Sequence, residues 1–169
     1  METGRTKTGP TETNPMERTS LMEITGKTAL VTGANRGFGR HLAAQLRERG
    51  ATVYAAARNP AAVDLPGVTP IALDVTDPAS VAAAAAATRD VSILINNAGS
   101  GTGASLLTGD LADIRLEMDT HFHGTLAVTR AFAPQLAEHE QSAILNVLSV
   151  LSWVSLCYRA EVRPGPQVA

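Results

Sequence analysis

The sequence has few of the residues from which several common kinds of site are built. Its single cysteine, Cys157, excludes an internal disulfide and a metal site made of several cysteines. The four histidines show no metal-ligand spacing with acidic residues, so no metal is expected. Lysine and arginine form no cluster and the net charge is −2, which argues against a nucleic-acid partner.

Long apolar runs are absent as well. No run approaches the roughly 18 residues of a membrane-spanning helix, so no membrane partner is expected. Residues 1–21 are nearly devoid of apolar side chains and lack the core of a signal peptide, and we expect a disordered N-terminal extension. These absences favour a cytoplasmic protein. Because apolar patterning starts near Met22, translation from Met16 or Met22 is a further hypothesis.

Apolar runs alternate with helical patterns along the rest of the chain, and a hydrophobic content of 44% in 169 residues suffices for one core. The alternation predicts an α/β fold, a Rossmann-like, doubly wound parallel sheet of about five strands with ligands at their carboxyl ends. Five strands fall short of the usual six, so the sheet is expected to be incomplete at its C-terminal edge. Strands are expected at 29–31, 51–57, 69–75, 91–96 and 143–148, and helices at 37–49, 77–88 and 110–139.

A glycine-rich turn joins the first expected strand to the first helix. It reads Thr32-Gly33-Ala34-Asn35-Arg36-Gly37-Phe38-Gly39. Backbone N–H groups at a helix N-terminus form a site for a phosphate, and glycines allow a pyrophosphate to approach closely. The G-x-x-x-G-x-G spacing differs from the standard G-x-G-x-x-G fingerprint, so by itself it fits a plain strand-to-helix turn as well as a nucleotide site.

The end of the second strand indicates which dinucleotide this turn would bind. An acidic residue there binds the ribose hydroxyls of NAD, whereas an arginine accommodates the 2′-phosphate of NADP. No acidic residue occurs from Thr52 to Ala57, Arg58 follows directly, and Arg36 lies within the glycine turn. We therefore expect NADP rather than NAD, with Arg58 in its site. The alternative is that both arginines are ordinary solvated side chains.

Polar residues follow three later strands, where they would share a sheet edge with the glycine turn. They are Asp74, Asn97 and Ser149. Their convergence predicts a ligand site at the carboxyl ends of the strands. Each also has a structural explanation: Asp74 as a turn cap, Asn97 as a residue ending a strand, and Ser149 as a strand-end hydroxyl.

With four motifs in order, the chain resembles the short-chain dehydrogenase/reductase family from about Met22 to Leu156. The motifs are the glycine turn, Asp74-Val75, Asn96-Asn97-Ala98-Gly99 and Asn146-Val147-Leu148-Ser149. The resemblance implies hydride transfer between NAD(P) and a small-molecule carbonyl or alcohol, with Ser149 as the catalytic serine. It also implies a set of cofactor-binding residues, Thr32, Gly33, Asn35, Arg36, Gly37, Phe38, Gly39, Asp74, Val75, Asn97, Ala98 and Gly99.

The chain departs from the family pattern at two places. The family has an asparagine in its long central helix, three residues before a glycine. Here Gly124 is present and His121 precedes it by three, either as a catalytic proton relay or as a residue of the helix surface. The family's Tyr-x-x-x-Lys pair matches no residues, because Val162 stands near the expected tyrosine position and no lysine follows Lys27.

The apparent loss of the pattern beyond residue 156 suggests C-terminal truncation or a frameshift, and we expect residues 22–156 to form a partial NADP-binding domain followed by a non-matching tail, 157–169. An oxidoreductase with negligible turnover alone is then expected, the alternatives being a non-catalytic NADP-binding module and a gene-decay fragment. Association into a homo-oligomer is expected through the 110–139 helix. Without a neighbouring helix and strand, the last strand would be an open edge, and apolar side chains would be less covered, among them Phe122, Phe132 and Leu136.

Overall fold

The computed structural model describes residues 22–149 of the chain. The expectations for the N-terminal extension, the tail and the missing Tyr-x-x-x-Lys pair fall outside these residues. Within them the elements are β1 (Thr28–Thr32), α1 (Gly37–Glu48), β2 (Thr52–Ala57), the short 3₁₀ helix η2 (Pro60–Ala62), β3 (Thr69–Ala72), α2 (Pro78–Ala87), β4 (Ile93–Asn96), α3 (Leu111–Met118), the π-helical segment η3 (Asp119–Gly124), α4 (Thr125–Ala137) and β5 (Ala143–Asn146).

All the strand pairs of the sheet are parallel, in the order β3-β2-β1-β4-β5. The strand order reverses at β1, because β2 and β3 extend to one side of it and β4 and β5 to the other. Leu30, in the middle of β1, is paired with Tyr54 of β2 and Leu94 of β4. Ligands of such sheets bind where the order reverses, outside the carboxyl ends of the strands. The sheet confirms the expected Rossmann-like fold.

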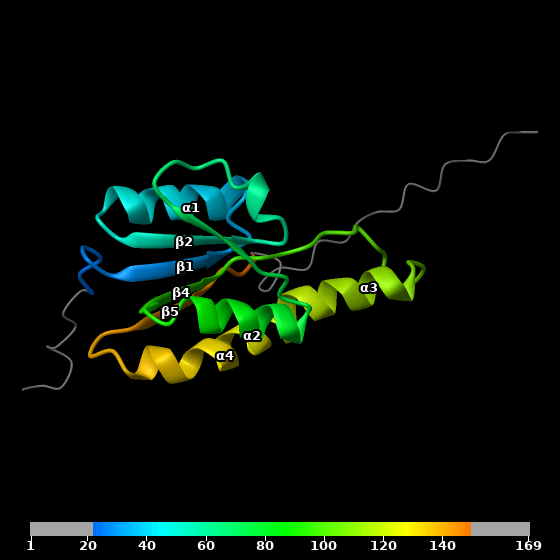
Figure 1. Cartoon of the computed structure of the whole chain (residues 1–169). Coiled ribbons are helices and arrows are strands. Elements are labelled where there is room, and N and C mark those ends of the chain that lie inside the picture. The colour runs from blue at the N-terminus through cyan, green and yellow to red at the C-terminus, as the bar shows by residue number, and fades with distance from the viewer. Residues whose placement is uncertain (1–21, 150–169) are drawn as a thin grey trace, which may run out of the picture.

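The core lies in two layers, one on each face of the sheet. In Figure 1, α1 covers one face while α2 and α4 cover the other. Successive β1 side chains point to opposite faces. Val31 accordingly packs in the cluster that contains Leu46 of α1, whereas Leu30 packs in the cluster that contains Phe132 of α4. This burial on both faces explains why the central strands are almost wholly apolar.

The expectation that Phe132 and Leu136 would be poorly covered is wrong. Phe132 is fully buried and Leu136 is 3% exposed, because α4 packs both side chains against the sheet and α2. The same expectation is confirmed for Phe122, which is 57% exposed. The edge strand β5 also leaves apolar side chains uncovered, since Ile144 and Leu145 are each about half exposed.

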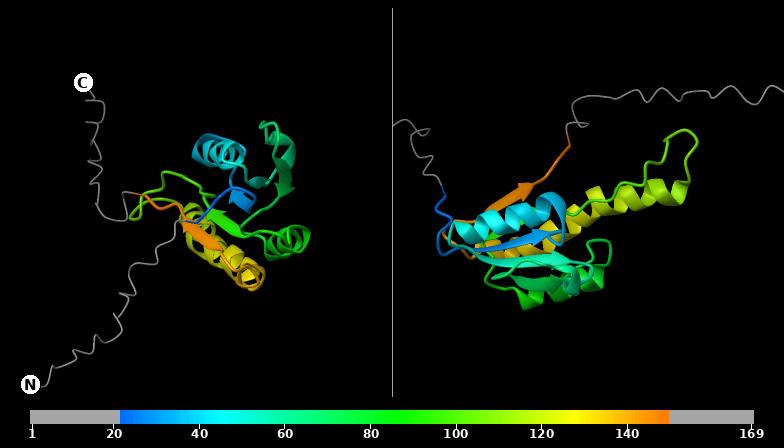
Figure 2. Two further views of the ribbon diagram at one scale, coloured as in Figure 1. Left: turned by 90° about the vertical axis from the view of Figure 1, so that its left-hand side faces the viewer. Right: turned by 90° about the horizontal axis from the view of Figure 1, so that it is seen from above.

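The expected helix over 110–139 has an irregular middle. It begins at Leu111, with Asp110 as its N-cap, and changes to π-helix from Asp119 to Gly124 before α4 continues it. Figures 1 and 2 show α3 projecting as an arm beyond the sheet, with the loop from β4 running outward alongside it to the tip, where α3 begins. The π segment therefore lies where this arm meets the carboxyl ends of the strands.

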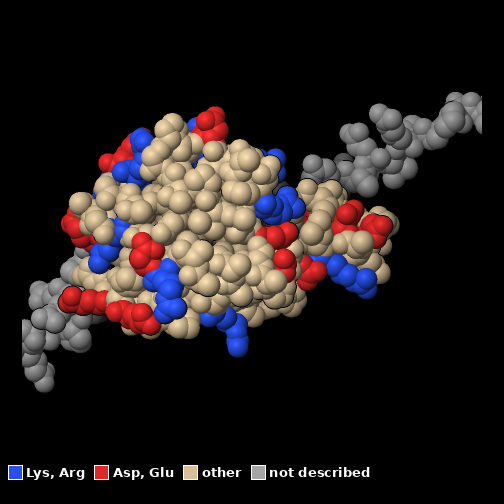
Figure 3. Space-filling view, in the orientation of Figure 1, with Lys and Arg blue, Asp and Glu red and all other residues tan. Residues whose placement is uncertain are grey.

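Figure 3 shows basic and acidic side chains interspersed over the face in view. Among the helices between residues 22 and 149, every one is too short or too polar to cross a membrane.

Candidate functional site

The glycine turn between β1 and α1 is shaped by glycines that no other residue could replace without strain or overlap. Gly33 and Gly37 have φ of +66° and +55°, in the left-handed region. A Cβ on Gly33 would lie 3.0 Å from Cα of Ala98, and one on Gly39 would overlap the carbonyl oxygen of Gly33 and the Asn97 amide. The backbones of β1, α1 and the segment after β4 therefore approach one another closely here.

The start of α1 leaves its first N–H groups without a side-chain cap. Arg36 is the N-cap residue, with extended backbone, and its side chain makes no capping hydrogen bond. The exposed residues Gly37 and Phe38 follow it. Uncapped N–H groups at the positive end of a helix dipole attract an anion. The residues present therefore fit a phosphate group.

Thr32 connects the end of β1 to the end of β4. Its buried hydroxyl accepts hydrogen bonds from the backbone N–H groups of Asn97 and Ala98, both at 2.9 Å, and donates to Ile95 O at 3.3 Å. The Asn97 side chain donates in return to Thr32 O at 2.9 Å. These bonds fix the two strand ends at the point where the strand order reverses, with the glycine turn directly beside them.

Asn96 makes a second set of connections that sequence reasoning left without a role. Its side-chain NH₂ donates to Thr129 Oγ1 of α4 at 3.0 Å and to Asn146 Oδ1 of β5 at 2.8 Å. The two neighbouring asparagines therefore connect different elements. Asn97 joins the end of β4 to β1, whereas Asn96 joins β4 to β5 and α4. Ser149 lies three residues beyond β5, exposed at the same edge of the sheet.

Arg58 and Asp74 lie beyond the carboxyl ends of β2 and β3. Asp74 Oδ1 accepts hydrogen bonds from the N–H of Thr76 at 2.9 Å and from its hydroxyl at 2.7 Å. These two bonds, the backbone bond first, hold the pKa of the Asp74 carboxyl below its ordinary value, and the charge of nearby Arg58 lowers it further. The turn-capping explanation of Asp74 is thus realised, and this turn ends β3 at Ala72 rather than at Val75 as expected.

His121 lies in the π segment and contacts the chain after β4. Its Nε2 is 2.7 Å from the carbonyl oxygen of Ser100, a distance that fits a donated hydrogen bond. A Cβ on Gly99 would come within 2.9 Å of the imidazole, so glycine is needed for this approach. Gly124 is similarly constrained, because a Cβ there would lie 2.8 Å from a methyl group of Val75. His121 is therefore attached to the site, while a relay role stays a prediction.

Glu117 is a residue of this region that sequence reasoning missed. Its Oε1 accepts hydrogen bonds from the backbone N–H and the hydroxyl of Thr102, at 2.7 and 2.6 Å. The hydroxyl bond and then the backbone bond hold the pKa of the Glu117 carboxyl below its ordinary value, and His121 adds to the effect. Its one sequence signal is its position four residues before His121, where two side chains of a helix lie side by side.

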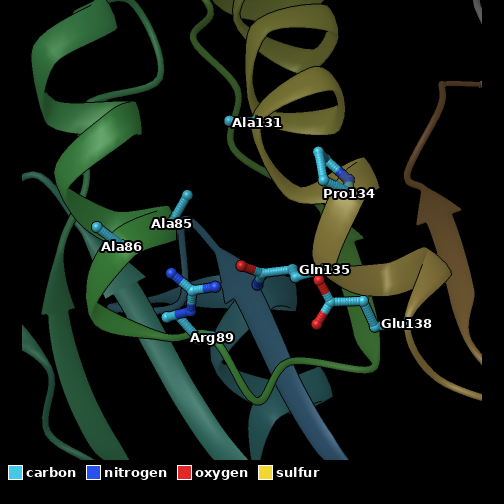
Figure 4. Close-up of a pocket in the computed structure, with 7 residues that line it drawn as sticks. All are labelled: Ala85, Ala86, Arg89, Ala131, Pro134, Gln135 and Glu138. Atoms are coloured by element: carbon cyan, nitrogen blue, oxygen red, sulfur yellow. The ribbon is translucent and has the colours of Figure 1, made fainter.

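A surface hollow between α2 and α4 lies away from this site. In Figure 4, Arg89 points toward Gln135 of α4, and Glu138, just after the end of that helix, also lines the hollow. The Gln135 amide donates to Thr88 O at 2.8 Å. Asp90, two residues on, accepts from the hydroxyl of Thr28, the first residue of β1. The hollow therefore opens at the amino ends of the strands, opposite the glycine turn.

Known proteins share this fold and these motifs. A family profile described as short chain dehydrogenase matches residues 27–159. A short-chain dehydrogenase/reductase of Pestalotiopsis microspora is 33% identical over 144 residues, 82% of this chain and 54% of that protein. D-erythrulose reductase of Gallus gallus is 33% identical over 137 residues, 78% of this chain and 56% of that protein. The chain spans about half the length of these relatives.

Solved structures of dehydrogenases also resemble this chain. A short chain dehydrogenase from Burkholderia cenocepacia in complex with NADP has a TM-score of 0.75 and 42% identity, covering 80% of this chain and 58% of that one. A gluconate 5-dehydrogenase from the same organism, in complex with NADP and tartrate, has a TM-score of 0.73 and 28% identity, covering 79% and 58%. The profile match, the relatives and the shared sheet together show that this chain belongs to the short-chain dehydrogenase/reductase family.

Proposed function

We propose that this chain provides the NADP-binding part of an NADP-dependent short-chain dehydrogenase or reductase. One observation carries the proposal: an arginine lies at the uncapped start of α1, a second follows β2, and β2 has no acidic residue. Arg36 sits at the N-cap of α1, and Arg58 follows β2 beside Asp74. A 2′-phosphate needs cations at the end of the second strand, whereas the ribose of NAD needs an acid there.

The site residues divide into groups along the bound dinucleotide. The diphosphate and adenosine end would be held by the glycine turn, and the 2′-phosphate by Arg58 with Arg36. Asp74 and Val75 would lie at the adenine, while Asn97, Ala98 and Gly99 would support the sheet beside the cofactor. Because they follow β4, on the other side of β1 from β2 and β3, the nicotinamide half of a dinucleotide bound across the reversal of strand order would lie near them. The turn residues assigned to this site are Thr32, Gly33, Asn35, Arg36, Gly37, Phe38 and Gly39.

The reaction of the complete enzyme would be hydride transfer to a small-molecule carbonyl, or from the matching alcohol. Nicotinamide, when bound, supplies the hydride carrier. Ser149 would hydrogen-bond the substrate oxygen at the carboxyl end of β5. His121 would hold Ser100 beside the nicotinamide half and, in the position of the family asparagine, would take part in proton transfer.

For the 169 residues alone we propose cofactor binding without turnover. No lysine follows Lys27, and Val162 stands near the position of the family tyrosine. Loss of a general acid costs about 10²–10⁴ in rate. NADPH consumption by the purified chain, followed with a panel of aldehydes and ketones, is expected to stay at background. A carbonyl-dependent rate above background would refute this part of the proposal and favour a working enzyme.

Nucleotide titration of the purified chain tests cofactor choice. We expect NADPH to bind more tightly than NADH, measured by the fluorescence of the reduced nicotinamide. Arg58→Ala removes one charge-assisted bond to the 2′-phosphate and is expected to weaken NADPH binding about tenfold, with NADH binding unchanged. Arg36→Ala is expected to have the same selective effect.

Arg89→Ala is the matched control, because it removes the same charge at the hollow near the amino ends of the strands, far from the glycine turn. It is expected to leave both affinities as they are. Equal binding of NADPH and NADH by the unaltered chain, or an equal loss of both in Arg58→Ala, would contradict the assignment of NADP. Failure of either nucleotide to bind a cooperatively melting protein would refute the proposed function itself.

We further propose that the chain self-associates through its central helix, the continuous helical region made of α3, η3 and α4. Apolar side chains along 110–139 are exposed, among them Phe122 at 57% and Leu126 at 46%. They lie four residues apart, so their side chains fall on one side of the helix. Apolar surface of this kind marks an interaction site more often than an ordinary solvated face.

A further inference from the structure

The segment that follows β4 is held in place although its sequence gives it little stiffness of its own. It reads Gly99-Ser100-Gly101-Thr102-Gly103, with glycine at every second position. It belongs to no helix or strand. Alternating glycines raise the conformational freedom of a loop, because each can adopt backbone angles that other residues avoid. Such a loop takes one shape only when contacts from elsewhere fix it.

The two residues of this segment that are not glycine contact α3 and the π segment that follows it. Ser100 O lies 2.7 Å from His121 Nε2. Thr102 donates both its N–H and its hydroxyl to Glu117 Oε1, at 2.7 and 2.6 Å. Glu117 of α3 and His121 of η3 are four residues apart, so successive turns of this helical region hold alternate residues of the loop.

The attachment at Glu117 is more than an exposed polar contact. Thr102 and Glu117 are both partly buried, whereas the two glycines that flank Thr102, Gly101 and Gly103, are exposed. The Thr102 hydroxyl also accepts the N–H of Ala104 at 3.2 Å, which extends the fixed segment by two residues. One carboxylate thereby orders the backbone from Thr102 to Ala104, and the two bonds from Thr102 hold the pKa of that carboxyl below its ordinary value.

We propose that Glu117 is a positioning residue, which fixes the loop 100–104 against the arm so that the wall beside the nicotinamide half of the cofactor is formed before the cofactor binds. The inference rests on the proposed function, because it needs NADP(H) at the carboxyl ends of the strands. The loop begins at the carboxyl end of β4, on the other side of β1 from β2 and β3, where the adenosine end is assigned, so a dinucleotide bound across the reversal of strand order would have its nicotinamide half beside the loop. A preformed wall raises affinity because the fraction of molecules able to bind is larger.

The test compares two ligands on the full 169-residue chain. NADPH has the nicotinamide half, whereas 2′,5′-ADP has only the adenosine and 2′-phosphate end. Glu117→Ala removes the acceptor and is expected to weaken NADPH binding about three- to tenfold while leaving 2′,5′-ADP binding unchanged. Glu117→Gln keeps an oxygen that accepts from Thr102 and is expected to restore NADPH affinity to within about twofold. Asp113→Asn is the control, since it alters charge on the same helix at an exposed residue.

Amide hydrogen exchange provides a readout that needs no ligand. Exchange at the Thr102 N–H is expected to be at least about tenfold faster in Glu117→Ala and near normal in Glu117→Gln, with β1 amides unaffected. Gly101→Ala adds a Cβ where no atom lies within 4 Å, and it is expected to recover part of the NADPH affinity in the Glu117→Ala background by stiffening the loop.

Each alternative result decides between the two proposals. Unchanged exchange at Thr102, or NADPH affinity unchanged in Glu117→Ala, would overturn the positioning role while leaving NADP binding intact. Equal weakening of NADPH and 2′,5′-ADP would also overturn it, because Glu117 would then support the fold as a whole. If the unaltered, folded chain binds neither ligand, the proposed function fails, and the nicotinamide part of this inference fails with it.

Discussion

Gly39 lies in the first turn of α1, where helix propensity and steric contact make opposite predictions. Alanine is the better helix former by up to about 1 kcal/mol, so Gly39→Ala should stabilise an isolated helix. In the folded chain the added Cβ would overlap Gly33 O and the Asn97 amide. We expect the steric overlap to outweigh the gain in helix propensity. Gly39→Ala should lower the free energy of unfolding by about 1–3 kcal/mol, measured by urea denaturation, and weaken NADPH binding, measured by nucleotide titration.

Gly37→Ala is the comparison for this substitution. A Cβ on Gly37 meets no atom within 4 Å, but its φ of +55° is unfavourable for alanine. Its expected cost is about 1 kcal/mol, from backbone strain alone. A Gly39→Ala protein as stable as the unaltered chain would show that α1 can move away from β4, and that the close approach is not required.

Asp74 gives the site a dependence on pH whose direction follows from its hydrogen bonds. Since Thr76 holds the pKa of Asp74 below its ordinary value of about 3.9, the ionised form stabilises the fold. That stabilisation is complete above pH ~4 and is lost as pH falls through the folded pKa. Because the side chain is partly exposed, its size is below about 1 kcal/mol. Thermal melts of Asp74→Asn and the unaltered chain should differ at pH 7 and converge under acid; a constant difference would contradict this account.

Single residues of the site could be predicted where their chemistry is local. The glycine turn could be predicted from its glycines, because glycine adopts the positive φ of positions 33 and 37 without strain. Glu117 could not be predicted in this way, because its partner Thr102 is fifteen residues away across a loop without regular structure. Its role is created by the fold rather than by its neighbours in sequence.

At the scale of the elements, the π segment is where pattern and structure differ. Apolar spacing over 110–139 predicts one continuous α-helix. The 3.6-residue periodicity of an α-helix does not indicate that six of these residues form a π-helix, which has more residues per turn. The segment Asp119–Gly124 changes the direction of the side chains, and it places His121 at Ser100 and Gly124 against Val75. π segments inside α-helices occur frequently at functional sites, which agrees with its position.

Gly124→Ala tests whether this packing defines the π segment. An added Cβ would lie 2.8 Å from a Val75 methyl group and 2.9 Å from Asp119 O. We expect a loss of about 1–3 kcal/mol in the free energy of unfolding, measured by urea denaturation. Truncating the partner in the double variant Gly124→Ala/Val75→Ala should recover part of that loss, because it makes room for the new methyl group. No recovery would mean that the backbone contacts, with Asp119 O at 2.9 Å and Val75 O at 3.0 Å, dominate.

For the whole molecule, the parallel pairing of the strands follows from the rule that strands alternating with helices form a parallel sheet. That rule accounts for the carboxyl-end convergence of the glycine turn, Asp74, Asn97 and Ser149. It could not indicate how well each helix covers the sheet. Phe132 and Leu136 are buried by α2 and β4 within the same chain, a contact between segments more than thirty residues apart in sequence.

Substitutions on the exposed side of the central helix test whether whole molecules associate through it. Phe122→Gln/Leu126→Gln replaces two side chains that are about half exposed, so the unfolding free energy should change by less than about 1 kcal/mol. Self-association, followed by sedimentation velocity over a concentration series, is expected to weaken. Leu106→Gln/Leu107→Gln is the control, since those side chains are 84% and 95% exposed at the tip of the loop before α3. Equal weakening by both pairs would indicate nonspecific apolar contact, whereas weakening by the helix pair alone locates the interface on the central helix.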